Sequence, residues 1–201
     1  MCSSDLTSAD EARVAAEALG YPVVMKIVSA DILHKTEIGG VLLHLNSPQA
    51  VVNGFNTLMR RAKKAKPEAR LDGVLVAPMV TDGVETILGV QRDPIFGPVV
   101  LFGLGGIFVE VFKDVAMRLA PFTEDVAAQM IREIKGFALL QGVRGKGPAD
   151  IEALIHTLTK LSAFASANAD RLESLDLNPF LVRPQGEGAV AVDALIVPRQ
   201  M

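Results

Sequence analysis

The sequence is poor in residues that would cross-link it or anchor it in a membrane. Its 201 residues include no Trp, one Tyr and one Cys. The single cysteine, Cys2, excludes an internal disulfide and a zinc site built from cysteines. The most apolar stretch, residues 98–109, is too short for a bilayer-spanning helix and is interrupted by glycines. Residues 1–10 lack the basic region and apolar core of a signal peptide, so we expect a cytoplasmic protein.

Neither sign of charge dominates, because 20 Lys and Arg nearly balance 23 Asp and Glu and leave a net charge of −3 at pH 7. The densest basic cluster, residues 60–66, ends a helical pattern just before Pro67. Positive charge there compensates the helix dipole, and we favour this interpretation over a nucleic-acid-binding patch. What the chain does have is a hydrophobic fraction of 50%, with 17 Gly and 11 Pro, which is typical of a compact α/β enzyme domain.

The first six residues look foreign to the rest of the chain. Met-Cys-Ser-Ser-Asp-Leu can be encoded in frame by sequencing-adapter DNA. We therefore expect residues 1–6 to be a non-native leader on a truncated gene fragment. Cys2 is left out of any mechanism for this reason.

Periodicity and capping signals predict alternating helices and strands. A capping box at residues 8–11 starts a helix that Gly20 can end, and Ser47-Pro48 starts another that runs to about Lys66. Strands are expected at 23–28, 40–45, 74–80, 84–90, within 97–111, at 175–182 and at 189–197, and helices at 123–134 and 148–167. We interpret 74–80 and 84–90 as a hairpin, and 97–111 as two buried strands around a glycine turn. This order predicts two α+β lobes with a boundary near residues 76–82.

The expected first lobe holds two candidates for phosphate chemistry. Lys26 lies mid-strand among apolar residues, where it either reaches a partner or ligand anion or faces solvent on a half-exposed strand. The loop that follows carries His34 and Lys35, then Gly39 and Gly40. Glycine lets backbone N–H groups approach phosphate oxygens, although the loop lacks the P-loop pattern and a lone loop histidine is more often structural.

The C-terminal strand pair carries oxygen donors. Alternation places Asp176 and Asn178 on one face of its first strand, and Asp193 lies on its second. A carboxylate and an amide oxygen, completed by water and nucleotide phosphates, are typical of a magnesium site; solvent-facing polar residues are the alternative.

Other charged residues are weaker candidates. The acids Glu85 and Glu110 lie in apolar strands and need partners, whether a ligand or a structural cation. Arg144 lies in a basic turn that either faces phosphate or is an ordinary surface turn.

Taken together, these segments resemble one enzyme family. The matching stretches are GYPVVMKIVS at 20–29, ILHKTEIGGV at 32–41, DPIFGP at 93–98, FGLGGIFVE at 102–110, RG at 144–145, LDLNP at 175–179 and VDA at 192–194. In this order, over nearly all of residues 7–197, the chain resembles the ATP-grasp β subunit of ADP-forming acetate–CoA ligase. That enzyme belongs to the NDP-forming acyl-CoA synthetases, which are related to succinyl-CoA synthetase. The resemblance implies an ATP-grasp fold with two lobes around a nucleotide cleft: an incomplete small lobe at 7–78 and a large lobe at 79–201.

The resemblance also implies a reaction. In this family, acyl-CoA, ADP and phosphate are interconverted with a carboxylic acid, CoA and ATP. A CoA-binding α subunit, or a fused N-terminal half, makes the acyl phosphate. Phosphate then passes through a loop histidine of the ATP-grasp part to ADP. His34 matches that histidine, and Asp176 matches a carboxylate that contacts the phosphohistidine.

The remaining roles follow from the same resemblance, with ATP or ADP and Mg²⁺ as the implied cofactors. Lys26 matches a lysine on the nucleotide phosphates, and Glu85 falls near the ribose. The backbone of Val76, Ala77, Pro78 and Met79 matches the hinge that reads adenine. Lys35, Gly39 and Gly40 are further expected nucleotide contacts, Asn178 and Asp193 match magnesium ligands, and Glu110 and Arg144 are additional candidates.

The sequence departs from the family pattern in two ways, and the second bears on whether this chain can catalyse the full reaction. Glu37 stands where the family more often has aspartate, which puts nothing essential in doubt. The family's ATP-grasp part begins before this sequence does, so we expect the first strand of the small lobe and the CoA half to be absent. We therefore predict no full ligase turnover by this chain alone.

The expected partners are the CoA-binding subunit or half, acyl-CoA bound through it, and further copies in a hetero- or homo-oligomer; nucleic acid and membranes are not expected. Two other functions stay open. One is a nucleotide-binding regulatory module attached to an acyltransferase, without turnover. The other is a different ATP-grasp ligase, such as a carboxylase, although such enzymes do not need a loop histidine.

Overall fold

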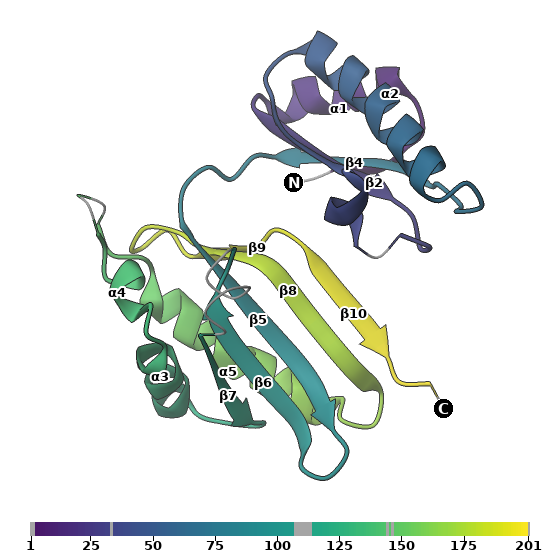
Figure 1. Ribbon diagram of the computed structural model, residues 1–201. Coiled ribbons are helices and arrows are strands. Elements are labelled where there is room, and N and C mark those ends of the chain that lie inside the picture. The colour runs from purple at the N-terminus through teal and green to yellow at the C-terminus, as the bar shows by residue number, and fades with distance from the viewer. Residues whose placement is uncertain (1–2, 33, 107–113, 144, 146, 201) are drawn as a thin grey trace. The chain divides into compact units, whose positions relative to one another are not determined.

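The computed structural model describes residues 3–32, 34–106, 114–143, 145 and 147–200 (Figure 1). The chain divides into two compact units, Met1–Thr81 and Asp82–Met201, and each is treated by itself below. The expected boundary, between residues 78 and 79, lies three residues before this division. Within the described residues, no helix is long and apolar enough to cross a membrane.

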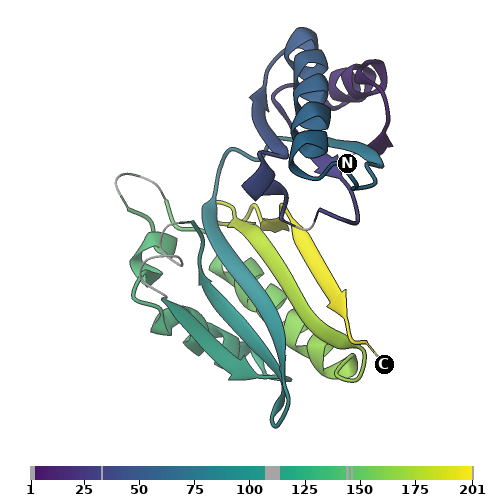
Figure 2. The same ribbon diagram turned by 45° about the vertical axis from the view of Figure 1, so that its right-hand side comes forward.

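The first unit is an antiparallel sheet with two helices on one face (Figures 1 and 2). Its strand order is β1 (Ser3–Leu6), β4 (Gly73–Pro78), β2 (Val23–Val28) and β3 (Val41–Leu45), and its helices are α1 (Ala9–Leu19) and α2 (Pro48–Ala65). The core forms where α2 packs on the sheet, because Val51, Phe55 and Leu58 recur at helical spacing on its buried side. They meet Met25 and Ile27 of β2, which are fully buried.

Residues of the expected leader take part in this sheet. Ser3–Leu6 forms β1 and pairs antiparallel with β4, with Ser3 opposite Val76 and Leu6 opposite Val74. Gly73 makes the approach possible, because a Cβ there would lie 2.5 Å from the carbonyl oxygen of Leu6. The origin of residues 1–6 stays a prediction, but Ser3–Leu6 is an integral edge strand.

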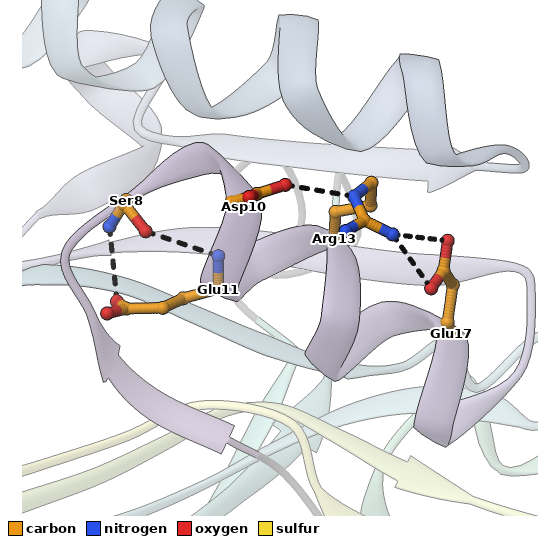
Figure 3. A network of polar contacts seen from close by, with 5 residues as sticks. All are labelled: Ser8, Asp10, Glu11, Arg13 and Glu17. Carbon is orange, nitrogen blue, oxygen red and sulfur yellow. Dashed lines mark hydrogen bonds and ion pairs between the residues drawn. The ribbon is translucent and has the colours of Figure 1, made fainter.

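Helix α1 begins with the predicted capping box (Figure 3). The Ser8 hydroxyl accepts a hydrogen bond from the N–H of Glu11 at 3.2 Å, and the Glu11 carboxylate accepts one from the N–H of Ser8 at 3.2 Å. Farther along, Arg13 contacts Asp10 and Glu17 on the exposed side. Exposed pairs contribute little, so the helix is held chiefly by its cap and by the burial of its apolar side.

The second unit is a larger antiparallel sheet with its helices on one face (Figures 1 and 2). The strand order is β10 (Ala194–Pro198), β8 (Leu172–Val182), β5 (Val84–Asp93), β6 (Gly97–Leu104) and β7 (Val115–Leu119), and β9 (Ala189–Ala191) pairs with β8. The helices are α3 (Glu124–Glu133), α4 (Phe137–Leu140) and α5 (Ile151–Ala167). Buried Leu88, Phe102 and Leu158 belong to the core beneath them.

The predicted hairpin of residues 74–80 and 84–90 is wrong. Strand β4 lies between β1 and β2 in the first sheet, whereas β5 lies between β6 and β8 in the second. Each strand thus pairs on both sides with partners that bury its apolar residues, and the turn-like sequence at 81–83 links the units instead. Of the two strands expected within 97–111, the first is β6, and the second falls on residues 107–111, which lie outside the described residues; the next described strand, β7, starts at Val115.

Asp150 connects the start of α5 to the turn before β9. One carboxylate oxygen accepts the N–H of Ala153 at 3.0 Å, which caps the helix. The other accepts the N–H groups of Gly186 and Gly188 at 3.0 and 2.8 Å. Three backbone N–H groups therefore donate to one buried carboxylate. Removing this carboxylate would leave donors unsatisfied both at the start of α5 and in the turn before β9.

Replacing Asp150 with alanine is expected to lower the free energy of unfolding of the second unit by about 1–2 kcal/mol, because the cap and two further hydrogen bonds are lost. Urea unfolding followed by circular dichroism measures this change. Asp170→Ala removes the same charge from an exposed turn and serves as the control. Equal stability of Asp150→Ala and Asp170→Ala would contradict the proposed role of Asp150 in holding α5 and the turn before β9 together.

The difference in the free energy of unfolding between the wild type and Asp150→Ala should also depend on pH. The N–H of Ala153, followed by that of Gly188, lowers the pKa of Asp150 against the opposing effect of burial. Because the folded pKa lies below the unfolded value of about 3.9, the stabilisation is complete above that value and is lost as pH falls through the folded pKa. The gap between wild type and Asp150→Ala should therefore stay constant down to about pH 5 and narrow below about pH 4.

Candidate functional site

Lys26 is buried on the central part of the first sheet. It pairs with Val41 of β3 and Leu75 of β4, and only 8% of its surface is exposed. Met25 and Ile27 point to the helices, so alternation places Lys26 on the helix-free face. With this burial, the alternative of a solvent-facing lysine on a half-exposed strand is wrong.

The loop after β2 is anchored where it leaves the sheet. The Ser29 hydroxyl donates to the carbonyl oxygen of Arg70 at 2.6 Å and accepts the N–H of Asp31 at 3.2 Å. The Asp31 carboxylate in turn accepts the N–H of Arg70 at 2.8 Å. These reciprocal contacts fix the first residues of the loop to the segment that leads into β4.

The same loop is anchored again where it returns. A short 3₁₀ turn, η1 (Lys35–Ile38), ends at Gly39, which has a left-handed φ of 63°. Gly40 then donates its N–H to the Lys35 carbonyl at 2.7 Å, and its carbonyl accepts the N–H of Ile27 at 2.9 Å. A Cβ at Gly40 would lie 2.8 Å from that Lys35 oxygen and 2.9 Å from Ile27 Cγ2, so only glycine fits.

His34 stands between these two anchors and is exposed at the start of η1. Lys35 follows it and is half-buried. The amides of Gly39 and Gly40 donate to the carbonyl oxygens of Thr36 and Lys35. In this conformation the two glycines therefore shape the loop, and their amides are not the free donors to phosphate oxygens that the sequence predicted. His34 itself presents an accessible imidazole on a tethered segment.

The expected adenine hinge lies at the end of β4. Val76 is buried, and Ala77 and Pro78 pair with Val24 and Val23 of β2. The N–H of Met79 donates to the carbonyl of Pro22 at 3.1 Å. The chain is therefore extended and fixed in the sheet at these positions.

Glu85 is exposed near the start of β5 and lies against a glycine turn. Its carbonyl oxygen accepts the N–H of Gly105 at 2.8 Å. A Cβ at Gly105 would lie 2.6 Å from Glu85 Cγ, so the glycine makes room for this side chain. The other candidates of this region, Glu110 and Arg144, lie outside the described residues.

A β-bulge in β8 positions the expected metal pair. Thr86 pairs with Phe180 and Leu88 with Leu177, so Asn178 and Pro179 together oppose a single residue of β5. The bulge falls where β9 ends and β10 has not yet begun. There the N–H of Asn178 donates to the carbonyl of Asp193 at 3.2 Å, which places the two residues side by side.

Asp176 joins this group on the helix-free face. It is exposed and pairs with Gly89 of β5 and with Leu195 of β10. Asn178, two residues on, is exposed as well, in keeping with the predicted alternation. The structure thus brings together Asp176, Asn178 and Asp193 in one short stretch of sheet.

This oxygen-donor group fits a magnesium ion that is bound mainly by its nucleotide. In the part of the chain that the structure describes, no three His, Cys, Asp or Glu side chains form a complete metal site. One carboxylate and one amide oxygen leave most positions of an octahedral ion to water and phosphate, which is how Mg²⁺ is commonly held. The donor chemistry therefore suits Mg²⁺ better than zinc.

The anchors of the His34 loop were missed by sequence reasoning. Ser29 and Asp31 are far from Arg70 in sequence, and Arg61 was interpreted only as helix-end charge. The Arg61 guanidinium donates to the carbonyl oxygen of Gly39 at 3.0 Å. Neither contact has a local sequence signal, because each depends on the pairing of β2, β3 and β4.

Substituting Gly40 with alanine should destabilise the first unit by about 1–3 kcal/mol, because the new methyl group overlaps a carbonyl oxygen and a buried side chain. Thermal unfolding by circular dichroism measures the loss. Gly147→Ala is the matched control, since a Cβ there meets nothing within 4 Å. If Gly40→Ala unfolds like that control, the close approach described here is not present in solution.

Comparison with known proteins gives a consistent set of matches. The model of the ATP-grasp domain family matches residues 4–197. Subunit beta of acetate–CoA ligase [ADP-forming] II from Pyrococcus furiosus is 47% identical over 188 residues, which cover 94% of this chain and 80% of that subunit. Acetate–CoA ligase [ADP-forming] I from Archaeoglobus fulgidus is 44% identical over 90% of this chain, but the match spans only 26% of that longer protein.

Solved structures of the dinucleotide-forming acetyl-coenzyme A synthetase 1 from Ca. Korarchaeum cryptofilum are also similar. One, with coenzyme A, acetyl-coenzyme A and a phosphorylated phosphohistidine segment in its site I orientation, has a TM-score of 0.84 and 40% identity, covering 96% of this chain and 83% of that one. Another, with coenzyme A and Mg-AMPPCP, has its phosphohistidine segment pointing towards the nucleotide binding site. Its TM-score is 0.79 and its identity 38%, over 98% of this chain and 86% of that one.

Proposed function

The chain belongs to the ATP-grasp family, and on this premise we propose that it is the nucleotide-binding, phosphate-relaying part of an ADP-forming acyl-CoA ligase. The expected fold class and family resemblance are confirmed by the comparisons. The observation that carries the proposal is an exposed imidazole, His34, on a segment anchored at both ends and following the buried Lys26.

The proposed reaction moves one phosphoryl group through His34. A neutral imidazole has a free nitrogen lone pair, which attacks the phosphorus held by the partner half. The bond from phosphorus to its carrier breaks as the P–N bond forms. A terminal phosphate oxygen of ADP then attacks the phosphohistidine, and ATP and free imidazole result. The same steps run backwards from ATP.

The residues of the first unit supply charge and orientation. Phosphoryl transfer needs alignment and neutralisation of negative charge more than covalent help. Lys26 and Lys35 neutralise the nucleotide phosphates in this proposal. The backbone of residues 76–79 takes the adenine, because its extended conformation can present peptide groups to a flat ring.

The second unit supplies oxygen donors. Asn178 and Asp193 hold Mg²⁺, which neutralises charge on the nucleotide phosphates when bound. Asp176, beside them on the helix-free face, is the carboxylate that we assign to the relay as a second catalytic group. Glu85 contacts the ribose hydroxyls, and Glu110 and Arg144 remain further candidates for nucleotide contacts.

The partner in this proposal is a CoA-binding subunit, or a fused half of the same enzyme, that makes the acyl phosphate. The match to a separate β subunit and to a quarter of a single-chain ligase supports both arrangements. Residues 7–78 and 79–201 then act as the small and large lobes. A cytoplasmic location fits this role.

Labelling with γ-³²P-ATP and Mg²⁺ tests the relay directly. We expect acid-labile, base-stable phosphate on the wild-type chain and none on His34→Ala, because phosphate bound to nitrogen has that stability profile and the substitution removes the proposed nitrogen nucleophile. His156→Ala is the control, since this histidine is also exposed but lies on α5. Label that persists on His34→Ala, or its absence from the wild type, would refute the proposal.

The metal assignment is tested by nucleotide binding. Asp193→Asn is expected to weaken Mg²⁺-dependent binding of a non-hydrolysable ATP analogue by about tenfold, and to leave metal-free binding unchanged. Isothermal titration with and without Mg²⁺ measures both. Asp170→Asn should bind like the wild type, and an equal effect of the two substitutions would argue against Asp193 as a ligand.

A further inference from the structure

Helix α2 presents one basic side chain to the His34 loop. Val51, Phe55, Leu58 and Ala62 of this helix are buried against the sheet, and Arg61 lies at the exposed margin of that buried surface. Its Nη1 donates to the carbonyl oxygen of Gly39 at 3.0 Å. The contact joins residues that are far apart in sequence and ties the loop to a rigid helix.

The fit between Arg61 and Gly39 extends beyond one hydrogen bond. A Cβ at Gly39 would lie 3.2 Å from Nη1, 3.4 Å from Cδ and 3.6 Å from Cζ of Arg61, so the guanidinium rests against the bare backbone of the glycine. Gly39 also needs its left-handed φ of 63° to turn the chain back into β3. A planar, always charged group with several donors suits this position better than an ammonium.

With the contacts of Ser29 and Asp31 to Arg70, Arg61 completes a pair of anchors on either side of His34. The related synthetase has its phosphohistidine segment in a site I orientation in one structure and pointing towards the nucleotide binding site in another. A segment that takes two orientations can deliver phosphate accurately only if its ends are held. In this chain, the Gly39 end is held to the body of the first unit by Arg61.

We propose that Arg61 is a positioning residue for phosphoryl transfer: it fixes the Gly39 end of the His34 segment so that the imidazole reaches its phosphate donor and acceptor in the correct geometry. This inference rests on the proposed relay function of His34. Arg61 is exposed and its hydrogen bond goes to a loop carbonyl, so its loss should change the placement of the loop and leave the fold intact.

The first measurement is independent of activity. The N–H groups of Gly39 and Gly40 donate to Thr36 and Lys35 within the segment. In Arg61→Ala their hydrogen exchange, followed by NMR on the 201-residue chain, should be about tenfold faster because the turn opens more often. Arg60→Ala removes the same charge from the preceding exposed position of α2 and should leave their exchange unchanged.

The second measurement is the rate of phosphate incorporation into His34 from ATP and Mg²⁺. Arg61→Ala should lower the maximal rate about tenfold with an unchanged KM for ATP, because misplacing the nucleophile affects the transfer step and not nucleotide binding. Arg61→Lys should restore part of the rate, since an ammonium can still donate to the Gly39 carbonyl. Arg60→Ala should match the wild type, and melting temperatures of all variants should agree.

The outcomes separate this inference from the proposed function. Without label on His34 in the wild type, the relay function fails, and the exchange rates alone decide whether Arg61 holds the loop. With label on the wild type, equal rates and equal exchange in Arg61→Ala and Arg60→Ala overturn the positioning role. A lowered melting temperature in Arg61→Ala without rescue by Arg61→Lys overturns it as well, because the residue would then be structural.

Discussion

The hydrogen bond from the N–H of Ile27 to the carbonyl of Gly40 fixes where the His34 loop closes on the first sheet. The pairing of β2 with β3 continues from this point, and Lys26 takes its buried position in the same register. The bond forms only because Gly40 has no side chain, since any Cβ would crowd Lys35 and Ile27. The accessible histidine, the buried lysine and the anchors on either side of the loop all depend on this closure.

Local chemistry made much of the fold predictable. The capping box of Ser8 and Glu11, the Ser47-Pro48 start of α2 and the β-branched run of β2 each carry a signal within a few residues, and all three elements lie where expected. The hairpin prediction failed because turn residues at 81–83 look alike whether they join paired strands or link two units. Strand partners are chosen by the burial of distant apolar residues, which no local pattern reports.

The residues of the candidate site could be predicted from the sequence, but the contacts that hold them in place could not. His34 and Lys26 could be selected from residue type and family resemblance, and the oxygen donors Asp176 and Asn178 from strand alternation. The contacts that support them could not, because the hydrogen bonds of Arg61 and of Asp31 join segments that only the folded sheet brings together. The bulge at Pro179 was equally hidden, since β8 alternates over residues 175–178 and again over 180–182.

That bulge lets the two proposed metal ligands lie side by side while the strand keeps its apolar residues in the core. Before it, odd-numbered Leu175 and Leu177 point to the helices; after it, even-numbered Phe180 and Val182 do so. Deleting one residue here would restore simple alternation with both pairs still facing the helices, but it would remove the bulge that sets Asn178 beside Asp193. The extra residue in this part of β8 is therefore not required by the core, and we expect it to be kept over evolutionary time only where the neighbouring positions of Asn178 and Asp193 are needed.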